Sequence, residues 1–267
     1  MTDRESLHFR IHDWLETQGY PLEMRLAKAI RRHDALQFRQ SWNYEDHETG
    51  KSREIDIICT KQDYVGFCEI NFIFECKGTT KPWVLFTSEE TGSSYHRLSG
   101  FGIFSKQAFA SAAGALFDFE DPDHTKLKEI PWLWKERHIG YSLVQGFDGN
   151  KDAPYSAVMS AVKAALWSKT NSVWQNGEFL SHVVCFPVVV TSSPLFECSL
   201  DENGDTVLKE VTHGFLFFNQ TIGDFTATCV SIVNEKYIDT FIQECLSVTQ
   251  KLEKAMEPDL KKLRDNL

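Results

Sequence analysis

The sequence predicts an α/β fold in which a mixed central sheet carries helices on both faces. Segments with a helical spacing of apolar residues alternate with short apolar runs that are typical of strands. Residues 182–190 (HVVCFPVVV) form a nearly continuous apolar run, which predicts a strand buried on both faces. Two alanine-rich segments, 105–119 and 155–168, predict helices that are small enough to pack closely on such a sheet.

The segments before the first alanine-rich helix predict two helices followed by strands. Gly19-Tyr20-Pro21 separates the two helices, because proline is tolerated in a first helical turn. The strands that follow are bounded by polar turns, including one at 61–63. The expected elements are helices 7–17 and 22–33, strands 36–44, 54–60 and 66–76, and an edge strand at 79–86.

The last third of the chain predicts additional strands and a long helix. Strands 195–200 and 207–218 surround the turn Asp201-Glu-Asn-Gly204, which is typical of a hairpin, and 227–233 predicts another strand. From Lys236 onward apolar residues recur as in an amphipathic helix, with an interruption expected near Pro258. We therefore expect a core of residues 1–200 and an extension of residues 201–267 that packs on the same domain.

The composition of the 267 residues, 42% hydrophobic and 25% charged, is ordinary for a soluble globular protein. No apolar run approaches the length of about 20 residues that spans a bilayer. The charged N-terminal segment lacks the apolar stretch of a signal peptide, so we expect a cytoplasmic protein with no membrane partner. Seven cysteines without a C-x-x-C pair indicate buried thiols rather than a zinc site or disulfides.

The formal net charge of −10 weighs against a protein that coats nucleic acid without specificity. Affinity for phosphates comes largely from clustered lysine and arginine side chains. A local basic groove is still compatible with this charge, because acidic side chains on the opposite side and in a metal site account for part of it.

Acidic residues occupy strand positions in two neighbouring predicted strands, within Arg53-Glu54-Ile55-Asp56 and Phe74-Glu75-Cys76-Lys77. Strand side chains alternate between faces, so Glu75 and Lys77 are expected on one face and Phe74 and Cys76 on the other. By the same rule Glu54 and Asp56 share a face, opposite Ile55 and Ile57.

This arrangement is suited to metal-dependent hydrolysis of phosphodiesters. Mg²⁺ prefers oxygen ligands and typically takes one or two protein carboxylates together with the substrate phosphate. We expect Asp56 and Glu75 to supply these carboxylates and the backbone carbonyl of Cys76 to add a third oxygen. The ammonium of Lys77 would orient a water molecule, stabilise the transition state, or act as a base if its pKa is lowered.

These two motifs resemble the PD-(D/E)xK nuclease superfamily, which includes Holliday-junction resolvases and many bacterial defence nucleases. The resemblance covers roughly residues 20 to 110, with residues 57–74 between the two acids. Ile55 stands where many members have proline. The resemblance implies that Asp56 and Glu75 bind metal and that Lys77 is the catalytic lysine, while Glu23 matches an auxiliary acid and Gln107 a polar residue that opens a later helix.

The resemblance further implies a restriction-endonuclease-like fold, with extra C-terminal strands and a long C-terminal helix in this chain. The implied activity is an endonuclease that acts on DNA with Mg²⁺, or with Mn²⁺ in its place, in defence against foreign DNA. The implied partners are DNA, further copies of the chain in a homodimer or larger oligomer, and a partner protein of a defence system.

Basic and polar residues around these motifs are expected to contact nucleic acid; they are Arg25, Lys28, Arg32, Lys51, Arg53 and Gln107. Simpler interpretations stay open for several of these residues. The basic residues of helix 22–33 would form a solvated face, and Glu23 would pair with Arg25 or Lys28. Glu54 would be a salt-bridge partner or a solvated strand residue rather than a metal ligand.

Two alternative functions also stay open. The first is a nuclease-fold protein that binds or assembles with little or no catalysis, and the second is a nuclease directed at RNA. The C-terminal helix is expected either to pack on its own core or to form a dimer interface.

Overall fold

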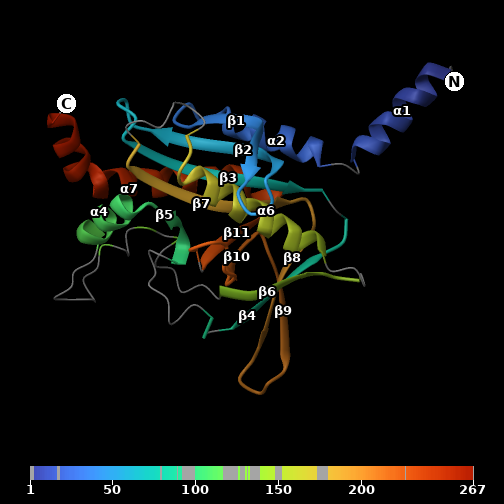
Figure 1. Cartoon of the computed structure of the whole chain (residues 1–267). Coiled ribbons are helices and arrows are strands. Elements are labelled where there is room, and N and C mark those ends of the chain that lie inside the picture. The colour runs from blue at the N-terminus through green and yellow to red at the C-terminus, as the bar shows by residue number, and fades with distance from the viewer. Residues whose placement is uncertain are drawn as a thin grey trace.

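The protein has a mixed α/β fold built on one large sheet, as the computed structural model shows (Figure 1). The structure describes residues 3–16, 19–78, 80–88, 90–91, 100–116, 126, 130, 132, 139–147, 152–172, 180–225 and 227–266. Residues 17, 79 and 117–119 of the predicted elements lie outside these ranges.

The sheet combines parallel and antiparallel strands in the order β1-β2-β3-β7-β11-β10-β6-β4-β8-β9, and β5 pairs with β7 beside this path. Parallel pairing joins β3 to β7, β7 to β11, β10 to β6 and β4 to β8. The strands are β1 (Gln37–Asp46), β2 (Lys51–Gln62), β3 (Cys68–Lys77), β4 (Trp83–Ser88), β5 (Ile103–Phe104), β6 (Ile139–Gln145), β7 (His182–Thr191), β8 (Leu195–Leu200), β9 (Thr206–Val211), β10 (His213–Phe218) and β11 (Thr228–Asn234).

Helices cover both faces of the sheet. On one face α2 (Tyr20–Ile30), α4 (Lys106–Leu116) and α7 (Ile238–Asp265) pack in the same core as Phe72 and Phe74 of β3. On the other face α6 (Asp152–Ser168) packs against Ile58 and Ile73. The short helix η3 (Glu235–Tyr237) leads into α7, and α1 (Asp3–Glu16) projects away from the sheet (Figure 1). None of the described helices is long and apolar enough to cross a bilayer.

The continuous apolar run at 182–190 forms β7, which is confirmed as a strand buried along its whole length. It lies between β3 and β11 and is parallel to both. Strands on both sides of residue 200 pair within this same sheet.

Two strand predictions are wrong in detail, and one strand was not predicted. The segment expected at a sheet edge forms β4, which lies between β6 and β8 with Trp83 fully buried. Its partner β6 is a strand that the sequence pattern did not reveal, because its alternation of apolar and polar residues is weak. The predicted strand 207–218 is divided into β9, which completes the hairpin with β8, and β10, which pairs with β11.

Helix α7 runs through Pro258, where an interruption was expected. Proline lacks the N–H that would bond to the carbonyl of Lys254, but both residues are exposed, so water can reach that carbonyl. Met256 and Leu260 are buried on the two sides of the proline and hold the helix on the core. The apolar face of α7 therefore packs on its own chain, which is the first of the two expected arrangements.

All seven cysteines are free thiols, and all except the partly exposed Cys198 are buried, as expected. Burial raises the pKa of the Cys59 and Cys185 thiols, to about 12 for Cys185. These thiols are therefore part of the packed interior rather than reactive groups.

A buried carboxylate ties the β1–β2 hairpin to α6. Asp46, which is only 3% exposed, accepts hydrogen bonds from Arg53 Nε at 2.6 Å and Lys163 Nζ at 3.1 Å. The backbone N–H of Glu48 donates a third bond to the same side chain at 3.0 Å. Burial opposes the ionised form, but these hydrogen bonds outweigh it and lower the pKa of Asp46 to about 2.

We expect Asp46→Asn to lower the free energy of unfolding at pH 7 by about 2 kcal/mol, because hydrogen bonds to a charged group are lost. The pKa of Asp46 is lower in the folded chain, so its stabilisation is complete above the unfolded value of 3.8 and is lost as the pH falls toward about 2. Urea unfolding at several pH values between neutral and strongly acidic tests this expectation.

The matched control is Glu45→Gln, on the same strand but exposed. It should change the free energy of unfolding by less than about 0.5 kcal/mol. An Asp46→Asn effect as small as that of the control, or one that persists undiminished at the acid end of the series, would contradict the assignment.

Candidate metal and catalytic site

The candidate site lies where β2 and β3 separate. These antiparallel strands pair from Gln62↔Glu69 to Ile57↔Phe74 and no further. Immediately beyond the last pair, Asp56 Oδ2 accepts a hydrogen bond of 2.7 Å from the backbone N–H of Cys76. The carboxylate thus takes the place of a strand carbonyl and holds Asp56 beside the end of β3.

The backbone is irregular on the β1–β2 side of this fork. In β1, Ser41 lies between the pairs Gln40↔Ile57 and Trp42↔Ile55 and has a left-handed φ of 52°. Ile55 packs with the core beneath α6, whereas Ile57 packs in the opposite core. The expectation that Ile55 and Ile57 share a face is therefore wrong, because the alternation of β2 breaks at Asp56.

Glu75 and Lys77 extend from the same strand and form an ion pair. Lys77 Nζ lies 2.7 Å from Glu75 Oε1, and the Glu75 side chain is largely buried. Phe74 and Cys76 point into the core formed with α2 and α7, as the alternation of β3 predicts.

Glu23 reaches the same place from α2. Pro21 lies in the first turn of this helix and Gly19 is its N-cap residue. A Cβ atom added to Gly19 would lie 3.6 Å from the carbonyl oxygen of Cys76 and 3.7 Å from Glu23 Oε1. The glycine therefore leaves open the space next to both oxygens.

These groups surround a cavity of about 230 Å³. Three carboxylates line it, from Glu23, Glu54 and Asp56, together with Cys76 and Lys77. The lining also includes Gly19, Tyr20 and Gly78. Glu75 is not among the lining residues and is joined to the cavity through its ion pair with Lys77. Glu54, which was expected to be a salt-bridge partner or a solvated strand residue, lines this cavity. Its spacing of two residues from Asp56, which places both on one face of a regular strand, is the signal in the sequence.

Burial, together with the neighbouring acids, raises the pKa values of the three acids Glu23, Asp56 and Glu75. Burial, with the charges of Asp56 and Glu54, raises the pKa of Glu23 to about 7. Burial and the Asp56 charge raise the pKa of Glu75 to about 7. Burial also raises the pKa of Asp56, although the Cys76 N–H and Lys77 oppose this shift. Such clustered acids are suited to a cation, because a positive ion would relieve their mutual repulsion.

Lys77 remains protonated in this environment. Burial alone would lower the pKa of its ammonium, but the Glu75 and Asp56 carboxylates outweigh burial and raise the pKa above its usual value. In the metal-free chain Lys77 is therefore a hydrogen-bond donor and a positive charge rather than a base.

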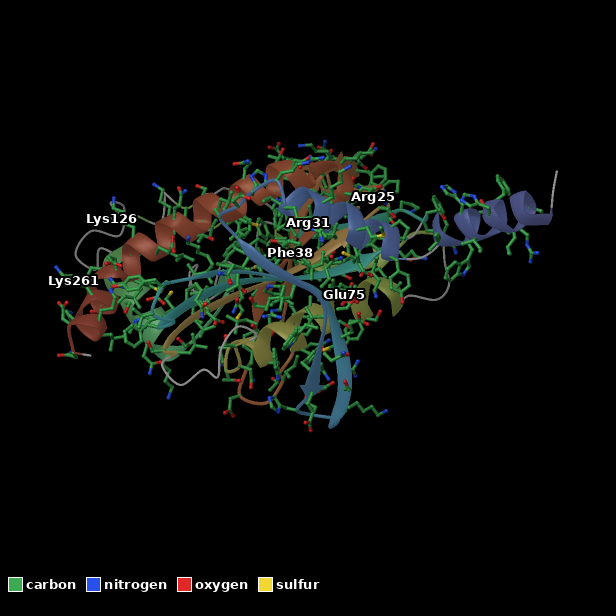
Figure 2. The ribbon with its side chains drawn as sticks, turned by 90° about the horizontal axis from the view of Figure 1, so that it is seen from above. Arg25, Arg31, Phe38, Glu75, Lys126 and Lys261 are labelled. Atoms are coloured by element: carbon green, nitrogen blue, oxygen red, sulfur yellow. The ribbon has the colours of Figure 1, made fainter. Side chains whose placement is uncertain are left out.

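The residues expected to contact nucleic acid are not gathered at this cavity. Arg25 and Arg32 of α2 form ion pairs of 2.8 Å with Glu235 and 2.9 Å with Asp239, beside the start of α7. In Figure 2, Arg25 and Arg31 lie on α2 next to α7, and Glu75 lies apart from them on the sheet. Arg53 is held by Asp46 at 2.6 Å.

The three other expected contact residues are exposed, and one of them is remote. Lys28 lies on α2 and Lys51 at the start of β2. Gln107 is the second residue of α4, two residues after Ser105, whose N–H bonds to the carbonyl of Val183. In the β3–β7 pairing Glu75 lies opposite Val189. Gln107 lies near Val183 instead, and the stretch of β7 from Val183 to Val189 spans about 20 Å.

Searches of protein families, curated proteins and solved structures find no match to this chain.

We expect Asp56→Ala to lower the free energy of unfolding of the metal-free protein by about 1–2 kcal/mol, because the buried N–H of Cys76 loses its acceptor. Asp56→Asn keeps an oxygen acceptor and removes a buried charge, so it should be at least as stable as the unsubstituted chain at pH 8. Urea unfolding in the presence of a chelator measures both variants, and equal losses in the two would contradict this role of the carboxylate.

Proposed function

We propose that this chain is a metal-dependent nuclease with a restriction-endonuclease-like fold that hydrolyses phosphodiester bonds in DNA. The observation that carries the proposal is the meeting of Asp56, Glu75, Lys77 and Glu23 at the fork between β2 and β3, with acid pKa values raised by burial and by one another. The resemblance of the two sequence motifs to the PD-(D/E)xK superfamily supports the same conclusion.

The donor set suits Mg²⁺, with Mn²⁺ as the alternative ion. Within the described ranges, no three His, Cys, Asp or Glu side chains come together as a complete metal site. Asp56 and Glu75 with the carbonyl oxygen of Cys76 would instead hold an ion that keeps several waters, as Mg²⁺ does. When bound, such an ion lowers the pKa of a water molecule and offsets charge on the phosphoryl oxygens.

The residues of the chain then have separate roles. The Lys77 ammonium, kept protonated by Glu75 and Asp56, donates to the attacking water or to a phosphoryl oxygen and so stabilises negative charge as it develops. Glu23, whose pKa of about 7 leaves it partly ionised near neutrality, accepts a proton from water on the α2 side. Gly19 leaves room for the substrate phosphate between Glu23 and Cys76.

A second candidate is a nuclease-fold protein that binds or assembles without cutting. It is favoured by the ion pairs of Arg25 and Arg32, which occupy the basic side chains expected to contact phosphates. It is also favoured by the net charge of −10. Only the resemblance to the PD-(D/E)xK superfamily suggests a defence role, an oligomeric state and a partner protein.

Cleavage assays separate the two candidates. We expect the unsubstituted chain to cut plasmid or linear DNA with Mg²⁺ and to lose activity when a chelator removes the ion. Asp56→Asn, Glu75→Gln and Lys77→Ala should each lower the rate by at least about a hundredfold, because charge stabilisation in the transition state is lost. RNA of the same sequence serves as a parallel substrate.

The control is Lys209→Ala, an exposed lysine of β9 outside the site. It should cut at the unsubstituted rate. Equal activity in the site variants and the control would refute the catalytic roles, and DNA binding without any cleavage would favour the second candidate. Faster cleavage of RNA than of DNA would reassign the substrate.

Gly19→Val tests the metal site without relying on cleavage. The added side chain enters the space between the carbonyl oxygen of Cys76 and Glu23 Oε1, and the φ of −70° at this position is compatible with valine. We expect Mn²⁺ affinity, measured by electron paramagnetic resonance, to fall by at least about tenfold. Gly19→Ala is the matched control, because its methyl group makes only ordinary contacts, and equal Mn²⁺ affinities in the two variants would contradict the proposed position of the ion.

A further inference from the structure

A second cavity of about 340 Å³ lies beside β5, at the other end of β7 from the acids. Its walls come from β5, the first turn of α4, the residue after α6 and the segment that precedes β11. Its volume is in the range of small-molecule sites. Since β5 pairs with Cys185 and Val184 whereas Glu75 lies opposite Val189, this cavity is separate from the candidate metal site.

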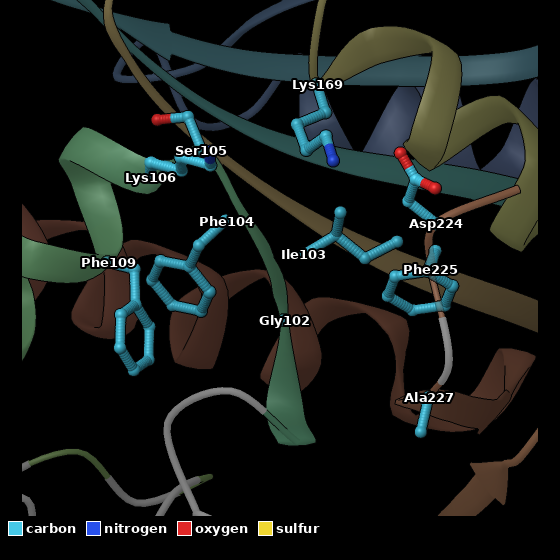
Figure 3. Close-up of a pocket in the computed structure, with 10 residues that line it drawn as sticks. All are labelled: Gly102, Ile103, Phe104, Ser105, Lys106, Phe109, Lys169, Asp224, Phe225 and Ala227. Carbon is cyan, nitrogen blue, oxygen red and sulfur yellow. The ribbon is translucent and has the colours of Figure 1, made fainter.

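Two lysines give the cavity a positive side. Lys169 is partly buried, and Figure 3 shows its amino group directed into the hollow above Ile103. Lys106 lies exposed at the start of α4. Within the described chain neither lysine forms an ion pair, including with Asp224, which lines the same cavity. Both ammonium groups are therefore available to an anion.

Phenylalanine rings line the cavity on both sides of β5 (Figure 3). Phe104 and Phe109 meet edge to face with ring centroids 6.2 Å apart and pack beside the core of α4 and α7, whereas Phe225, from the segment before β11, packs beside the core of α6 on the side of Lys169. All three rings are partly exposed, so each offers surface to a ligand. A flat ring that packs on such side chains gains about 1–3 kcal/mol in comparable nucleobase contacts.

Backbone groups add directional contacts. Ser105 N–H bonds to the Val183 carbonyl, so by the alternation of an antiparallel ladder the N–H and C=O of Phe104 point away from β7. Ser105 Oγ accepts from Ala108 N–H, which caps one amide of α4 and leaves those of the first turn directed outward. The N–H and C=O of Phe104 offer one donor and one acceptor, which suit the edge of a base. The neighbouring N-terminus of α4 suits a phosphate.

We propose that this cavity binds a mononucleotide. The phosphate lies between Lys106 and Lys169, the base packs against Phe225, and the Asp224 carboxylate accepts a hydrogen bond from a ribose hydroxyl or an exocyclic amine. The cavity combines lysines, an aromatic ring and one carboxylate. This lining matches a ligand that has an anionic group at one end and hydrogen-bond donors at the other. The proposal is independent of nuclease activity.

Calorimetric titration of the full chain, in the presence of a chelator, tests the proposal. The probes are AMP, GMP, CMP and UMP, with inorganic phosphate and adenosine as separate arms. We expect at least one mononucleotide to bind with a dissociation constant in the micromolar range, and phosphate and nucleoside to bind at least about tenfold more weakly. No binding of any mononucleotide at about 1 mM overturns the proposal, as does phosphate that binds as tightly as the nucleotides.

Substitutions locate the site. Lys169→Glu and Phe225→Ala should each weaken nucleotide binding by at least about tenfold, and so should Lys106→Glu, which alters an exposed side chain and leaves folding intact. Lys209→Glu on β9 is the matched control, with the same charge change on the distant hairpin, and should bind as the unsubstituted chain does. Binding that is unchanged in both the Lys106 and Lys169 variants overturns the proposal.

Discussion

The hydrogen bond from the Cys76 N–H to Asp56 is the interaction on which the candidate site depends. It forms where the ladder between β2 and β3 ends, so it fixes an acid of one strand to the backbone of the next. The bond fixes the Glu75–Cys76 peptide, and the carbonyl of the following peptide, Cys76–Lys77, lies near Gly19. A regular ladder would place a carbonyl at this position and direct Asp56 elsewhere, so the left-handed Ser41 and the broken alternation of β2 are part of how the site is built.

The site concentrates negative charge at a cost to stability. Glu23, Asp56 and Glu75 all have raised pKa values because burial and mutual repulsion disfavour their ionised forms. Lys77 offsets only part of this charge, since one ammonium faces several carboxylates. Proteins tolerate such arrangements where function requires them, and a bound cation would convert the repulsion into binding energy.

The sequence was informative where structure depends on neighbours along the chain. The meeting of Asp56 with Glu75 and Lys77 could be predicted because β2 and β3 are consecutive antiparallel strands with a two-residue period. The interior position of β4 could not, because it depends on β6 and β8, which are remote in sequence. The partners of Arg25 and Arg32 lie more than 200 residues away, so a helix face that looked solvated or DNA-binding is joined to α7 instead.

The ion pairs of Arg25 and Arg32 would be only a weak obstacle to a phosphate that approached α2. Both arginines are about half exposed, and exposed pairs contribute at most about 1 kcal/mol, so a phosphate can compete for them. The position of a phosphate would depend more on the N-terminus of α2. Its cap residue, Gly19, lines the cavity with Tyr20 and Glu23. The positive end of a helix favours an anion at that position. A phosphate that entered beside Gly19 would therefore meet the helix N-terminus and Lys77 together, on the side where the acids would hold the proposed cation.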